Sequence, residues 1–82
     1  MKWIKTGREV RLNGESTVYY EAVNAPYSIE SRKRAIRHAN GAGHWMHTSY
    51  FLIFKDGTEK EYYSLKDAKE AAERFEMEGE NQ

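Results

Sequence analysis

The last third of the chain constrains the fold most strongly. Residues 48–54 (TSYFLIF) form an apolar run, residues 55–58 (KDGT) resemble a turn, and residues 59–63 (EKEYY) are polar and aromatic. β-Branched and aromatic residues on either side of a glycine-containing turn are typical of a β-hairpin. Both faces of the first strand would be apolar, so we expect it to be a central strand. The more polar second strand is expected near an edge of the sheet.

A capped amphipathic helix is predicted directly after this hairpin. Ser64 precedes the helical pattern and Asp67 follows three residues later, a combination that suits the free amide groups and positive dipole of a first helical turn. The apolar residues then recur at spacings of one, three and four, which places them on one helical face: Leu65, Ala68, Ala71, Ala72 and Phe75. The alanines in this stripe would let the helix approach a sheet closely.

The first 24 residues predict a short β-meander. Residues 1–5 and 9–12 have the composition of two short strands, and residues 17–23 are rich in β-branched and aromatic side chains. Between them, Asn13 and Gly14 form a dipeptide that accepts positive φ in a hairpin turn. We therefore expect three strands in this part of the chain.

Residues 27–39 (YSIESRKRAIRHA), which follow a break at Pro26, fit two different structures. As a helix, the segment would have only Ile29 and Ile36 as strong hydrophobes, which is a thin stripe for a helix that must bury one face. As a strand, its first residues continue the alternation of the preceding strand. We expect a strand over residues 27–34, with the helix as the alternative.

These patterns together predict a single α+β domain over residues 1–78 and a frayed tail over residues 79–82. The domain would consist of a small, meander-like antiparallel sheet of four to six short strands, with one C-terminal helix packed on one face. A chain of 82 residues is too short to build two separate cores. Two glycines within residues 40–43 predict a loop.

The composition excludes several classes of protein. The chain has no cysteine, which rules out disulfides, thiolate catalysis and cysteine-ligated zinc. Its longest apolar run, residues 50–54, is too short to cross a bilayer, and the first residues contain no apolar run of signal-peptide length. We expect a cytoplasmic protein that has no membrane partner and no cofactor.

The charges are distributed unevenly although they sum to zero. Residues 1–55 carry nine Lys or Arg and four Asp or Glu, a net charge of +5, and residues 56–82 carry four and nine, a net charge of −5. Such asymmetry is typical of a basic binding face with an acidic face elsewhere, and equally of two ordinary solvated surfaces.

The basic half contains a cluster that fits nucleic-acid binding: Arg32, Lys33, Arg34, Arg37 and Trp45. Arginine and lysine neutralise phosphates, and an aromatic ring stacks on an unpaired base. We therefore expect a small non-catalytic binding module that engages nucleic acid through these residues. The alternative is an ordinary charged strand with Trp45 in the core.

Residues 48–75, two strands followed by a Ser-capped, alanine-rich helix, are similar to the sheet-plus-helix units of recombinase arm-binding and plant AP2-type DNA-binding domains. Those domains contact DNA with a three-stranded sheet dense in Arg and Lys, so the resemblance implies a DNA-binding hairpin. In this chain the matching hairpin residues Glu59 and Glu61 are acidic. We therefore expect any contact with nucleic acid at residues 32–37 instead.

The three histidines, His38, His44 and His47, suggest two further chemistries. Three imidazoles would bind zinc if the loop folded back, and histidines beside cations act as acid and base on a phosphodiester. On a strand, however, positions 44 and 47 point to opposite faces. The chain also has no nucleophile motif, phosphate loop or convincing carboxylate pair. We expect neither a metal site nor enzymatic activity.

The acidic half supports an alternative function as a protein-interaction or inhibitor domain. It would act through its hairpin and C-terminal helix, with these candidate residues: Glu59, Glu61, Glu70 and Glu73. A simpler explanation for the helical pair is salt bridging with lysines four residues earlier. A homodimer formed through an open sheet edge is a further alternative. The sequence is compatible with a monomer and with a homodimer.

Overall fold

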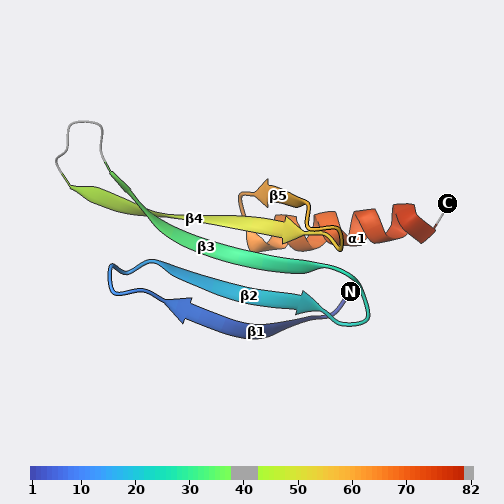
Figure 1. Cartoon of the computed structure of the whole chain (residues 1–82). Coiled ribbons are helices and arrows are strands. Elements are labelled where there is room, and N and C mark those ends of the chain that lie inside the picture. The colour runs from blue at the N-terminus through green and yellow to red at the C-terminus, as the bar shows by residue number, and fades with distance from the viewer. Residues whose placement is uncertain (38–42, 81–82) are drawn as a thin grey trace.

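A computed structural model describes residues 1–37 and 43–80, with backbone only at residues 37, 44, 79 and 80. Five strands and one helix follow in the order β1 (Trp3–Val10), β2 (Ser16–Ala22), β3 (Ser28–Arg37), β4 (His44–Ile53), β5 (Glu59–Tyr62) and α1 (Leu65–Glu80). The strands form one antiparallel sheet in sequence order, and α1 packs on it (Figure 1). This architecture confirms the predicted α+β class.

β1 differs from the prediction for the first residues. The two short strands expected at 1–5 and 9–12 are wrong, because Trp3–Val10 is one continuous strand paired with β2. The register shifts between Lys5 and Gly7, and such a bulge absorbs one extra residue without ending the ladder. The predicted turn is present, with Gly14 at a φ of 90°.

β3 confirms the strand predicted for the ambiguous segment and extends it to Arg37. Ile29 pairs with Tyr20 on one side and with Leu52 on the other, and its side chain is fully buried. The long pairing with β4 explains why the strand continues through residues that looked helical, because each ladder step satisfies backbone groups on both strands. Of the predicted loop 40–43, residues 40–42 lie outside the described residues.

The core lies between α1 and the sheet. As predicted, the Ser64 hydroxyl caps the helix by accepting a hydrogen bond from the Asp67 amide, at 3.0 Å. The buried core residues are small on the helix and branched on the sheet: Ala68, Ala71, Ala72, Ile29 and Leu52. The helix continues to Glu80, so residues 79 and 80 are helical rather than part of the expected tail. Within the described residues, no helix is long and apolar enough to span a bilayer.

The helix covers only one end of an elongated molecule that measures 52 × 24 × 21 Å. It packs on β3, β4 and β5 near both chain termini (Figure 1). Pairing with β2 ends at Lys33, and pairing with β5 begins only at Tyr50. Residues 34–37 and 44–47 therefore form a two-stranded projection, which we call the distal ribbon. We call the sheet face opposite α1 the open face.

Leu52→Ala is expected to reduce the free energy of unfolding by about 2–5 kcal/mol, because it leaves a cavity beneath the closely packed alanines. Urea denaturation measures this loss. Ile53→Ala is the matched control, since Ile53 lies next in β4 on the open face and is only half-buried. A larger loss at Ile53 than at Leu52 would contradict this assignment of the core.

Candidate nucleic-acid interface

Strand geometry divides the predicted cationic cluster between two faces. Successive residues of β3 point to opposite sides of the sheet, and Ile29 marks the side that packs on α1. Arg32 and Arg34 therefore lie on the open face, and Lys33 lies on the other face. The side chain of Arg37 lies outside the described residues. The cluster that is continuous in sequence does not form one surface patch.

Arg32 is held by carboxylates of the sheet. Its Nε lies 3.0 Å from Glu30 Oε1, its Nη2 lies 2.6 Å from Glu59 Oε1, and its guanidinium carbon lies 4.2 Å from the Phe51 ring centroid. Partial burial acts to lower the pKa of Arg32, but the hydrogen bonds to Glu59 and Glu30 outweigh it and raise the pKa. Two carboxylates already neutralise this cation, which makes it a poor ligand for phosphate.

Arg34 has a different environment. Its Nη1 donates to the carbonyl oxygens of Ser16 and Lys33, and its Nη2 donates to the Thr17 hydroxyl, each at 3.0 Å. These acceptors are neutral, and among the described residues no carboxylate forms an ion pair with Arg34. The hydrogen bonds therefore hold a positive charge in place on the open face without neutralising it.

Glu15 supports the base of the distal ribbon. Its Oε2 accepts a hydrogen bond from the Ala35 amide at 2.9 Å, two residues beyond Lys33, where the backbone pairing of β3 with β2 ends. Its Oε1 accepts a hydrogen bond from Asn13 Nδ2 at 3.1 Å. Arg11 Nη1 lies 3.7 Å from Glu15 Oε1. The Ala35 hydrogen bond is the main reason that the pKa of Glu15 lies below its ordinary value, followed by the bond from Asn13.

Trp45 lies on the surface and not in the core. It is 45% exposed, and its ring centroid lies 5.7 Å from that of His47 in an edge-to-face arrangement. Trp45 pairs across the ribbon with Ile36, which is 37% exposed, and His47 pairs with Arg34. These four side chains share the open face, and we call them the distal platform. The platform combines an aromatic surface with one cation, Arg34, that forms no ion pair within the described part of the chain.

The predicted site included Arg34 and Trp45 but not Ile36 or His47, although His47 was considered for metal binding and acid–base chemistry. The missing information is the register of β3 against β4, which places Ile36 opposite Trp45 and Arg34 opposite His47. The sequence did contain a signal for this register, namely the two glycines that predict a loop near residue 40. In a regular hairpin, residues equally distant from the middle of the loop are paired across the two strands.

The four glutamates of the alternative site occupy two separate surfaces. Glu59 and Glu61 lie on the open face, opposite Ile53 and Phe51, whereas Glu70 and Glu73 are on the helix that covers the other face. Three of the four already have cationic neighbours: Arg32 for Glu59, Lys66 for Glu70 and the N-terminal ammonium group for Glu73. The structure does not bring them together as one acidic surface.

The hypothesis of a zinc site or an acid–base pair involves three histidines, but His38 and the side chain of His44 lie outside the described residues. Within the part of the chain that is described, no three His, Asp or Glu residues are grouped closely enough to hold a metal ion.

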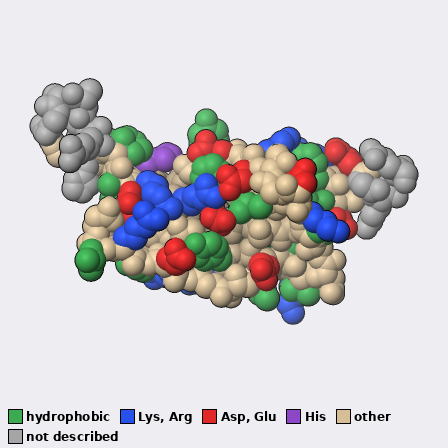
Figure 2. Space-filling model, viewed as in Figure 1, with side chains coloured by type: hydrophobic (Ala, Val, Ile, Leu, Met, Phe, Trp, Pro, Cys, Tyr) green, Lys and Arg blue, Asp and Glu red, His purple; other side chains and the backbone are tan. Residues whose placement is uncertain are grey.

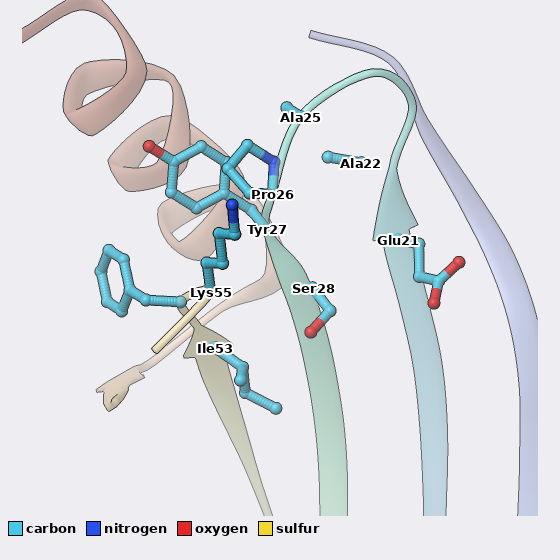
Figure 3. A pocket seen from close by; sticks show the side chains of 9 residues that line it. Glu21, Ala22, Ala25, Pro26, Tyr27, Ser28, Ile53 and Lys55 are labelled. Atoms are coloured by element: carbon cyan, nitrogen blue, oxygen red, sulfur yellow. The ribbon is translucent and has the colours of Figure 1, made fainter. Parts of the chain in front are cut away.

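A shallow hollow lies at the other end of the sheet, beside the turn between β2 and β3 (Figure 3). Its walls include Tyr27, Lys55 and Glu21, and the Glu21 carboxylate is directed away from the Tyr27 ring. Burial and a hydrogen bond to Glu76 raise the pKa of Tyr27. The labelled side chains do not converge as an acid–base pair.

On the visible surface, several Lys and Arg side chains gather near a histidine toward the distal ribbon (Figure 2). Over the middle and the opposite end, Asp and Glu side chains are interspersed with further Lys and Arg side chains (Figure 2). No protein-family model, curated protein or solved structure gives a significant match to the chain. The geometry of the distal platform therefore carries the functional argument.

Acidification is expected to weaken the base of the ribbon. Because the folded-state pKa of Glu15 lies below its ordinary value of 4.5, ionised Glu15 stabilises the fold above that pH, and this stabilisation is lost as the pH falls through the lowered pKa. The amide chemical shift of Ala35 should therefore titrate with a midpoint below 4.5, and Glu15→Gln should abolish the transition.

The Thr58 amide is the internal control for this titration. It donates to Asp56 Oδ1 at 2.9 Å, and this hydrogen bond lowers the pKa of Asp56. Its own titration should persist unchanged in the Glu15→Gln protein. An Ala35 midpoint at or above 4.5 would show that Glu15 does not support the ribbon in this way.

Proposed function

We propose that this protein is a small non-catalytic module that binds single-stranded nucleic acid on the distal platform. The observation that carries the proposal is the exposed Trp45 ring, with the His47 ring centroid 5.7 Å away and Arg34 on the neighbouring strand. An unpaired base offers a π face for stacking on Trp45, while the adjacent phosphate is attracted to Arg34.

The arrangement favours single strands over a duplex. Bases in a duplex are stacked on each other, so their faces are not accessible to an aromatic side chain on the surface of a sheet. Stacking on one aromatic side chain contributes about 1–3 kcal/mol per base and does not depend strongly on sequence. The net negative charge of α1, at the other end of the molecule, repels phosphates, which directs a strand toward the distal ribbon. We therefore propose weak sequence preference and strong dependence on salt.

Three of the predicted cations have different parts in this proposal. Arg34 supplies the local positive charge, whereas Arg32 serves the sheet through its ion pairs. Lys33 lies on the opposite face and contributes only at long range. We place this activity in the cytoplasm, in line with the absence of cysteine.

Trp45→Ala is expected to weaken binding of a single-stranded oligonucleotide about tenfold, because one base loses its stacking surface. Tryptophan fluorescence measures binding directly, since a base stacked on Trp45 quenches its emission. Trp3 remains in the Trp45→Ala protein, and its emission should not respond to the oligonucleotide. Affinity of the unchanged protein should fall steeply as salt is added.

Arg34→Gln and Lys33→Gln form a matched pair of variants that tests which face of the sheet binds nucleic acid. Both remove one positive charge at adjacent positions of β3, but only Arg34 lies on the open face. The Arg34 change should weaken binding markedly and the Lys33 change only slightly, with folding of both checked by circular dichroism. Equal losses from the two changes would overturn the proposed surface, and so would tighter binding to a duplex than to a single strand.

A further inference from the structure

The outer edge of β4 is only partly covered. β4 runs from His44 to Ile53, but β5 pairs only with residues 50–53. Among the described residues, positions 44–49 have no neighbouring strand on that side. The Phe54 amide donates toward the β5 side, to the carbonyl of Thr58, and backbone direction alternates along a strand. The amide and carbonyl groups of residues 44, 46 and 48 therefore lie in the plane of the sheet and point away from β3, toward the uncovered edge.

The two outermost strands carry the features that normally prevent edge-to-edge pairing, but this part of β4 does not. β1 has Lys5 and Arg8 and a bulge between Lys5 and Gly7, and β5 is only four residues long, with the sequence EKEY. Lysines, bulges and short charged edge strands all block pairing. The exposed β4 segment, HWMHTS, has no Lys, Arg, Asp, Glu or Pro and contains no register shift. It is the unprotected edge of the described sheet.

We propose that a second copy of the chain pairs with this edge, β4 against β4, to form a symmetric dimer. A two-fold axis perpendicular to the sheet makes the two strands antiparallel and keeps both open faces on the same side. Directly opposed residues must then share a face, which is satisfied when Met46 faces Met46 of the other copy. This register joins the outward backbone groups of residues 44, 46 and 48, and it sets Trp45 opposite His47 of the other copy.

Charge complementarity supports a second copy as the occupant of this edge. Because the two copies run in opposite directions, the basic distal ribbon of each extends toward the acidic β5 and α1 of the other. The ribbon sequence has Arg34 and Arg37 and no Asp or Glu, whereas β5 and α1 together have eight Asp or Glu and four Lys or Arg, so this arrangement places unlike charges side by side. A parallel arrangement would bring like charges together.

One exposed aromatic side chain lies beside the pairing edge, where the second copy would cover it. Tyr63 is 94% exposed and directly follows Tyr62, the last residue of β5 to pair with β4, so it lies where the ribbon of the second copy would begin. Met46, which is partly exposed, lies on the pairing segment itself, and edge-to-edge pairing leaves the open face with Trp45 accessible. The dimer also brings two distal platforms together on one side of a continuous sheet. The pairing uses backbone groups and does not depend on the proposed nucleic-acid binding.

Sedimentation equilibrium of the full chain without nucleic acid tests the dimer, over concentrations up to about 1 mM. We expect a reversible monomer–dimer equilibrium. Met46→Lys should weaken it by about tenfold or more, because two lysines then face each other across the axis. Val10→Lys is the matched control, since it makes a similar apolar-to-lysine change on the outermost strand at the other edge, and it should leave the equilibrium unchanged.

An equimolar mixture of the Met46→Lys and Met46→Glu proteins tests the register. Opposite charges then face each other across the axis, so the mixture should recover a heterodimer that neither variant forms alone. Hydrogen exchange in the unchanged protein needs no variant to fold. The amides of Met46 and Thr48 point to solvent in a single copy, and they should become protected as the concentration is raised.

Three results would each overturn the proposal. The first is a monomer at every concentration tested. The second is a dimer that Val10→Lys disrupts and Met46→Lys does not. The third is a dimer in which the Met46 and Thr48 amides exchange as fast as in the monomer. Because nucleic acid is absent from all three measurements, failure of the dimer and failure of the proposed binding function are separate outcomes.

Discussion

Close packing of α1 on β3 and β4 is the contact on which the rest of this structure depends. Alanines at positions 68, 71 and 72 let the helix backbone approach Ile29 and Leu52, and these five residues are the buried core. So small a core stabilises only the end of the sheet that lies beneath the helix. The distal ribbon lies beyond that core, so its order depends on backbone ladders and on polar contacts made by side chains such as Glu15 and Arg34. A compact core at one end thus leaves a polar and aromatic projection at the other.

The arginines of β3 show how a strand assigns different roles to similar neighbouring residues. Arg32 bridges β3 to β5 through Glu59 and stacks on Phe51, which ties the sheet together on the face that has no helix. Arg34, two residues later on the same face, is bound by neutral oxygens and keeps its charge available. Lys33, between them, points the other way. A run of cations in the sequence is therefore one structural residue, one candidate ligand and one solvated side chain.

Local patterns were sufficient to predict much of the fold. The capped helix, the β4–β5 hairpin and the strand character of residues 27–34 each follow from spacing and turn chemistry within a short segment, and the structure confirms them. β1 was predicted as two strands because a bulge near Gly7 interrupts the alternation while the ladder with β2 continues. The candidate site was predicted only in part. Trp45 and Arg34 carry recognisable chemistry, but the carboxylates around Arg32 come from Glu30, nearby in the sequence, and from Glu59, far along it.

The sequence by itself determined the class of fold, the helix and its cap, and the opposite charges of the two halves, because composition, spacing and capping act between residues close together in the chain. Only the tertiary structure decided which cations are neutralised, which share a face with Trp45, and which part of β4 has an unpaired edge. Those properties depend on register and on where β5 ends relative to β4, and both are set by packing between segments that are distant in the chain. The alternation of residues along a strand specifies which side chains share a face, and the register with the neighbouring strand specifies which residues each of them contacts.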